Sequence, residues 1–244
     1  MKKTIIALLA LAGVASADTI NALEGEWTTG SRLDRATWTK TDSGTLALTN
    51  SNWSQAYAIY DLGTNLTGAW DLSTTVARYD GNAGFTLTLV GKTQAITIGT
   101  QDYKSGTSYY GTTTNVGANG YSFQDTLEGI SGTKVEPALK AAEGVFNVDQ
   151  TASIAASTDL DADNNVILTL TLGGSAVSTP FTTTLNLGQG FELDKIVVWG
   201  DGGNSRSNWA VTEMTLTTPN VPEPTTATLS LLALAGLAAR RRRK

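Results

Sequence analysis

Two tryptophans frame the stretch of this chain that is most typical of a ligand-binding loop. Between them lies a glycine-rich segment with an acid, an amide and a guanidinium. Sugar sites combine flat aromatic faces with planar hydrogen-bonding groups, and a loop between strands can present both. The candidate ligand-binding residues are Trp199, Asp201, Asn204, Arg206 and Trp209. The alternative is that both indoles pack in a core and the loop is only a polar connection.

An acidic run is the second candidate site, with carboxylates at alternate positions: Asp159, Asp161 and Asp163. Alternating oxygen ligands begin a calcium-binding loop. An EF-hand would also need Gly in place of Asn164 and Glu in place of Leu170, and neither is present. An acidic hairpin turn is therefore the preferred interpretation. Calcium is the one cofactor that the sequence leaves open.

Catalytic chemistry is restricted by composition, because the chain has no His and no Cys. Catalytic triads, thiol nucleophiles, histidine bases, His-ligated zinc and disulfides are therefore excluded. Paired carboxylates remain. Glu192-Leu193-Asp194 begins the Glu-x-Asp-x-x-Glu pattern of jelly-roll glucanases, but Val197 stands where the second Glu should be. The sequence predicts no enzyme, and a hydrolase with carboxylates from distant strands stays open as the alternative.

The elements that must position these residues are strands. Apolar residues alternate with threonine or other polar residues within 84–98 and 165–198, and Gly, Asn and Asp separate the runs. Threonine at every second position suits the solvated face of an antiparallel sheet. The predicted fold class is all-β, an antiparallel two-sheet β-sandwich. Further strands are expected at about 45–49, 55–61, 70–79, 145–155, 191–199 and 209–217.

One region departs from this pattern. Residues from about 100 to 145 are rich in Gly, Ser, Thr and Tyr, and they predict a long loop or an irregular hairpin insertion. Within it, 134–143 is the only hint of a helix, a turn or two that ends at Gly144.

The arrangement over 21–217 is similar to the concanavalin-A-like and laminin-G-like jelly rolls. The residues that carry the resemblance are the region of Trp27 and Trp38, the two alternating segments, and a closing strand from Asn208 to Thr217. The resemblance implies that the closing strand pairs near the N-terminal strand.

The C-terminal segment has three features in order. Val221, Pro222, Glu223 and Pro224 come first, then an uncharged run over 227–239, then Arg240, Arg241, Arg242 and Arg243 with Lys244. The prolines cannot continue a strand or helix, so the motif is expected to be accessible. The uncharged run predicts a short hydrophobic helix in transient membrane contact, since a full span needs about 20 residues. The basic residues would anchor it on the cytoplasmic side. A weak tail anchor is the alternative.

This order resembles the PEP-CTERM protein-sorting domain of Gram-negative bacteria. The resemblance implies handling by an exosortase, a membrane protease-transferase that cuts at the motif and passes the body to the surface. It implies nothing about the activity of the body.

The N-terminal residues predict a signal peptide. Lys2 and Lys3 precede an apolar segment, and Ala15-Ser16-Ala17 is an A-x-A cleavage site. We expect export by the Sec machinery and cleavage after Ala17. The expected domains are a signal peptide at 1–17, a β-sandwich at 18–219 and a sorting segment at 220–244. The expected location is the cell envelope, the outer surface or the extracellular space.

The net charge of the body restricts the classes of partner that it can bind. Without the seven basic residues and one acidic residue of the two end segments, the body keeps 10 basic and 21 acidic side chains, a net charge of −11. Nucleic acid and anionic membranes are disfavoured, because binding phosphate needs clustered Lys and Arg. The sequence therefore predicts an exported, non-catalytic β-sandwich that binds glycan, with extracellular polysaccharide as the candidate partner, or that serves a structural role.

Overall fold

The computed structural model describes residues 17–31, 36–50, 55–79, 85–92, 95–100, 108–113, 139–144, 150–175, 180–201 and 209–218. Residues 19–218 form one compact unit. Ala17 is exposed, whereas Ala15, the sorting motif, the basic cluster and the predicted C-terminal helix lie outside the described residues. Within the described ranges, no helix is long and apolar enough to cross a membrane.

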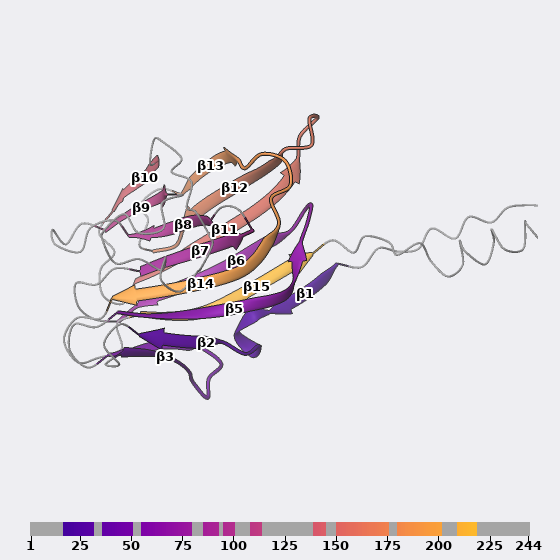
Figure 1. The fold of residues 1–244 in the computed structure, drawn as a ribbon. Helices are drawn as coiled ribbons and strands as arrows, with labels where there is room; N and C mark the ends of the chain where they lie inside the picture. The colour runs from indigo at the N-terminus through magenta and orange to yellow at the C-terminus, as the bar shows by residue number, and fades with distance from the viewer. Residues whose placement is uncertain are drawn as a thin grey trace, which may run out of the picture. The chain divides into compact units, whose positions relative to one another are not determined.

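The described strands form two sheets, which lie one behind the other in Figure 1. Sheet A has the order β13 (Phe181–Asn186), β12 (Val166–Gly173), β11 (Gln150–Leu160), β6 (Asp71–Arg78), β15 (Trp209–Thr218), β4 (Leu46–Asn50), β3 (Ala36–Lys40), and β1 (Asp18–Asn21) also pairs with β15. Sheet B has the order β10 (Leu139–Gly144), β9 (Ser108–Thr113), β8 (Ala95–Thr100), β7 (Phe85–Gly91), β14 (Leu193–Asp201), β5 (Gln55–Leu66), β2 (Thr28–Ser31). A 3-10 turn, η1 (Ala22–Glu24), follows β1.

This architecture confirms the predicted antiparallel sandwich. Neighbouring strands in both sheets pair antiparallel, as β11 and β12 do over eight residue pairs. The closing strand β15 pairs with β1, as the jelly-roll resemblance implied.

The core lies between the sheets and follows from the alternation. In β12, Val166, Leu168, Leu170 and Leu172 are buried, and the residues between them are half-buried on the outer side. Aromatic rings join the two layers. Phe85 of sheet B lies 6.3 Å from Trp38 and 5.4 Å from Trp209, both in sheet A, between ring centroids. The Trp38 indole also donates a 3.0 Å hydrogen bond to the carbonyl of Ala56 in β5, which ties sheet A to sheet B.

The helix predicted at 134–143 is wrong where it can be checked. Residues 139–144 form β10, which pairs antiparallel with β9, and 134–138 lie outside the described residues. Ala, Lys and Glu favour helix locally, but pairing with a neighbouring strand overrides this weak preference. The region at about 100–145 therefore holds two paired strands and is not simply a loop, which agrees with the hairpin alternative.

Two buried threonines allow one substitution to be tested in opposite settings. Thr74 in β6 is fully buried, and its hydroxyl has no hydrogen-bond partner among the described residues. The hydroxyl of Thr158 in β11, also buried, donates to the Gly68 carbonyl at 2.8 Å and accepts from the Trp70 N–H at 3.1 Å. Valine has nearly the same shape as threonine, so the change isolates the hydroxyl.

We expect Thr74→Val to raise the free energy of unfolding by about 1 kcal/mol, because a buried hydroxyl without a partner costs about 1–3 kcal/mol. Thr158→Val should lower it by about 1–3 kcal/mol, because the buried Trp70 N–H and the partly buried Gly68 carbonyl lose their partner. Urea denaturation of both variants measures this. A change of the same sign in both would contradict it.

Candidate functional site

Strands β5 and β14 are apolar on both faces, unlike the Thr-alternating strands of sheet A. In β5, Ala56 and Ala58 belong to the core between the sheets. Tyr57 and Ile59, on the opposite face, belong to a second hydrophobic cluster with Val90, Ala95, Val197 and Trp199. Val90, Ala95 and Val197 have no exposed surface, so this face of sheet B is covered at those three positions.

Strand register brings part of this cluster together. Trp199 pairs directly with Tyr57, and Val197 pairs with Ile59. Val197 has no exposed surface, whereas Tyr57, Ile59 and Trp199 are only half-buried. We call these three half-buried residues the outer strip. Directly opposed side chains are close enough for aromatic rings to contact each other.

A glycine makes room for one ring of the outer strip. Gly30 of β2 pairs with Tyr57. A Cβ at Gly30 would lie 2.1 Å from the hydroxyl oxygen of Tyr57 and 2.3 Å from its Cζ. The tyrosine ring therefore extends across β2 over a position that no side chain could share.

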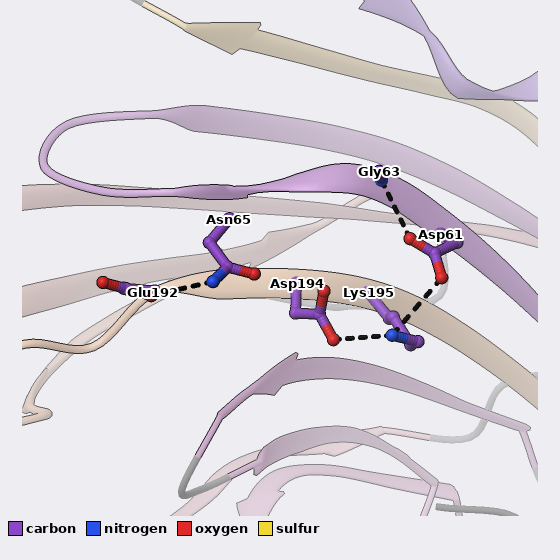
Figure 2. A network of polar contacts seen from close by, with 6 residues as sticks. All are labelled: Asp61, Gly63, Asn65, Glu192, Asp194 and Lys195. Atoms are coloured by element: carbon purple, nitrogen blue, oxygen red, sulfur yellow. Dashed lines mark hydrogen bonds and ion pairs between the residues drawn. The ribbon is translucent and has the colours of Figure 1, made fainter.

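Charged groups lie farther along the same two strands, around a bulge in β14 between Leu193 and Lys195. Figure 2 shows that the Lys195 ammonium contacts two carboxylates, Asp194 at 2.6 Å and Asp61 at 3.3 Å. Glu192 accepts a 2.9 Å hydrogen bond from the Asn65 amide and forms an ion pair with Lys92. We call Asp61, Lys92, Glu192, Asp194 and Lys195 the ion cluster.

These contacts keep the cluster charged. The Gly63 N–H donates to Asp61 at 2.8 Å and, with Lys195, holds the pKa of the Asp61 carboxyl below its ordinary value. The hydrogen bond from Lys92 lowers the pKa of Glu192 in the same way. The hydrogen bond to Asp194, followed by that to Asp61, raises the pKa of Lys195. The shifts of Asp61, Glu192 and Lys195 therefore favour the charged forms of these three groups at neutral pH.

The hydrolase alternative can be compared with this arrangement. Asp61 and Asp194 lie close together, as the two acids of a glycosidase do. A glycosidase, however, needs one acid with a raised pKa, so that it can donate a proton. Here the pKa of Asp61 is lowered, and both carboxylates are bound to the same ammonium. Val197, at the glucanase position, is fully buried. The pair has the chemistry of an ion bridge.

The two tryptophans of the predicted loop do not share a site. Trp199 lies on the outer face of sheet B, whereas Trp209 lies between the sheets with no exposed surface. The Arg78 guanidinium lies 5.9 Å from the centre of the Trp209 ring. A fully buried ring cannot stack on a sugar. Trp209 therefore packs in the core, which was the alternative to ligand binding for this residue. Asp201 ends β14 and its side chain is not described, and Asn204 and Arg206 lie outside the described residues.

The acidic run forms the hairpin turn between β11 and β12. One Asp161 oxygen accepts from the Asp163 and Asn165 backbone N–H groups at 2.9 and 2.8 Å, and the other accepts from the Asn165 amide at 2.9 Å. Asn164 takes the left-handed conformation, with φ of 60°. In the described part of the chain, no group of three acidic side chains is placed to hold a metal. The Asp161 carboxylate thus serves the turn.

This turn gives a pH-dependent prediction. The hydrogen bonds from the Asn165 side chain and backbone hold the pKa of Asp161 below its ordinary value. Folding is therefore stabilised while the carboxylate is charged, and this contribution is lost as pH falls through the folded-state pKa. Asp161→Asn keeps an acceptor and removes the charge. We expect wild type to be the more stable at pH 7, with the difference shrinking below pH 4 as followed by thermal unfolding. An unchanged difference would contradict it.

The residues that sequence reasoning missed are Tyr57, Ile59 and the ion cluster outside 192–194. A signal for Tyr57 and Ile59 exists: Ala56 to Tyr60 and Ile196 to Trp199 are apolar at successive positions, without the intervening threonines of sheet A. Such runs mark strands that are covered on both faces.

Comparison with known proteins supports two parts of this description. Residues 220–244 match the family model of the PEP-CTERM protein-sorting motif. This motif indicates export and sorting to the bacterial cell surface. No curated protein sequence matches the chain.

Several solved structures are similar to this chain at low sequence identity. The potassium-bound carbohydrate recognition domain of Emp46p is 14% identical, with a TM-score of 0.51 over 81% of this chain and 94% of that one. The calcium-bound exoplasmic/lumenal domain of VIP36 is 12% identical, with a TM-score of 0.49 over 84% and 91%. The CBM2 module of an evolved Dit protein from Lactobacillus casei BL23 phage J-1 is 10% identical, with a TM-score of 0.48 over 76% and 80%. At 14% identity the likeness to the Emp46p domain concerns the fold alone, a lectin-like jelly roll.

Proposed function

We propose that this protein is a cell-surface glycan-binding protein without catalytic activity, and that it binds glycan through the outer strip. The observation that carries the proposal is the cross-strand pair of Trp199 and Tyr57, whose rings keep exposed surface on the outer face of sheet B. A single half-buried aromatic residue is ordinary, whereas apolar side chains gathered in one place on a surface mark sites for ligands or partners. Aromatic rings on an outer face suit the apolar face of a sugar ring.

Polar groups next to the outer strip complete the chemistry that a sugar needs. Asp61 lies two residues after Ile59 in β5, and Lys195 of β14 pairs with Asp61. A carboxylate accepts hydrogen bonds and an ammonium donates them, so the two together can bind hydroxyl groups that both donate and accept. Both sit on strands, which hold a site more rigidly than loops do.

The sorting segment fits this role. Recognition of Val221 to Pro224 by an exosortase-type enzyme, after Sec-dependent export and cleavage behind Ala17, would deliver the sandwich to the envelope of a Gram-negative-type bacterium. Extracellular polysaccharide is the partner met there. Asp201, and Asn204 and Arg206 after it in the chain, remain candidate contacts.

A glycan array tests the proposal. Residues 18–218, which contain every described strand and both hydrophobic clusters, are screened with and without calcium while released sugar is measured in parallel. Saturable binding to one sugar class without turnover is expected. Turnover would favour the hydrolase alternative. A blank array would contradict glycan binding and leave the structural role.

A further inference from the structure

The charges beside the outer strip determine which glycans it can accept, and this inference rests on the proposed function. In the ion cluster, both cations are already paired: Lys195 with Asp61 and Asp194, and Lys92 with Glu192. Three carboxylates against two ammonium groups leave a net negative charge. No ammonium of this cluster is left over for a ligand carboxylate or sulfate.

The cluster is near enough to act on a ligand at the outer strip. Asp61 is four residues from Tyr57 along β5, about 13 Å at the usual rise of a strand. The Debye length is about 10 Å at 0.1 M salt and about 30 Å at 0.01 M. The field of the cluster therefore reaches the strip, most strongly at low salt. The charge of −11 on the body acts in the same direction.

We propose that the outer strip is selective for neutral polysaccharides, and that the ion cluster disfavours glycans bearing carboxylate or sulfate groups. The ion-paired lysine and its carboxylates offer hydrogen bonds to hydroxyl groups without offering an unbalanced positive charge. An acidic glycan would meet net negative charge, or would have to displace Asp61 or Asp194 from Lys195.

The test uses polysaccharides that share a backbone and differ in charge: hydroxyethyl cellulose with carboxymethyl cellulose, and dextran with dextran sulfate. Residues 18–218 are used, because the cationic C-terminal end would itself bind anions. Biolayer interferometry at 10 and 150 mM salt gives the Kd for each. We expect the neutral member of at least one pair to bind at least tenfold more tightly than its charged partner, with a larger ratio at low salt.

The double variant Asp61→Asn, Asp194→Asn leaves Lys195 without a carboxylate. We expect it to reduce the ratio of the affinity for the neutral member to the affinity for the anionic member by tenfold or more. The reduction comes from a gain of salt-sensitive binding to the anionic member. The matched control is Glu213→Gln, Asp71→Asn, which makes the same change of net charge at exposed positions of sheet A. At 150 mM salt it should leave the ratio of affinities within about twofold, since exposed charges beyond a Debye length of about 8 Å are largely screened.

The outcomes separate the two proposals. Wild-type protein that binds the anionic member as tightly as the neutral one overturns the charge selectivity and leaves glycan binding in place. A double variant that matches its control also overturns the role of the ion cluster. An absence of binding to all four polysaccharides, together with a blank array, overturns the proposed function itself.

Discussion

Trp209→Ala should be the most damaging single truncation discussed here, lowering the free energy of unfolding by about 3–5 kcal/mol. The Trp209 ring has no exposed surface, and it packs against Phe85 at 5.4 Å and beneath the Arg78 guanidinium. Its removal leaves a cavity between the two sheets, because the surrounding backbone is fixed by the hydrogen bonds between strands and cannot move in to fill the space. Chemical denaturation measures the loss, and a shift of the midpoint at unchanged m-value would show that stability alone has changed.

Trp209→Phe is the control, since a smaller ring keeps the contact with Phe85 and should lose clearly less stability. Trp199→Ala is the second comparison, because that ring is only half-buried. Equal losses for Trp199→Ala and Trp209→Ala would contradict the assignment of one indole to the core and the other to the surface.

The fold class could be predicted from the sequence, because the alternation of apolar and polar residues in β12 and β13 indicates which side of each strand is buried. The sequence was not sufficient for the two tryptophans. Successive residues of a strand face opposite sides of the sheet, so the alternation can be followed only within one strand. A glycine-rich connection separates Trp199 from Trp209, and the sequence therefore does not show how the alternation in β14 relates to that in β15. Only the sheet assignment reveals that one ring points outward from sheet B and the other inward from sheet A.

The ion cluster was beyond sequence reasoning for a related reason. Asp61 and Lys195 are far apart in the chain and meet only because β5 pairs with β14. The bulge between Leu193 and Lys195 shifts the register by an amount that no local pattern indicates. Glu192 and Asp194 were noticed as the start of a glucanase pattern, but Lys92, which binds Glu192, comes near it only because β7 pairs with β14. The strand β10 shows the same limit, since its helix-forming composition yields to its partner β9.

Trp199→Leu should raise the Kd for the glycan selected on the array about 30-fold. Leucine keeps apolar contact with the second hydrophobic cluster but has no flat face, and a central tryptophan commonly contributes 2 kcal/mol or more to binding. Trp199→Phe restores an aromatic face and should bind within a few-fold of wild type. Isothermal titration calorimetry measures both, with thermal unfolding as the check that each variant is folded.

The two variants separate stacking from simple burial of apolar area. If the indole only excludes water, leucine and phenylalanine should weaken binding to a similar degree, because both are apolar side chains of moderate size. If the aromatic face contacts the sugar, only leucine should fail. Full binding by Trp199→Leu would contradict the assignment of the outer strip to the binding site. The remaining candidate would be the segment after Asp201, which contains Asn204 and Arg206.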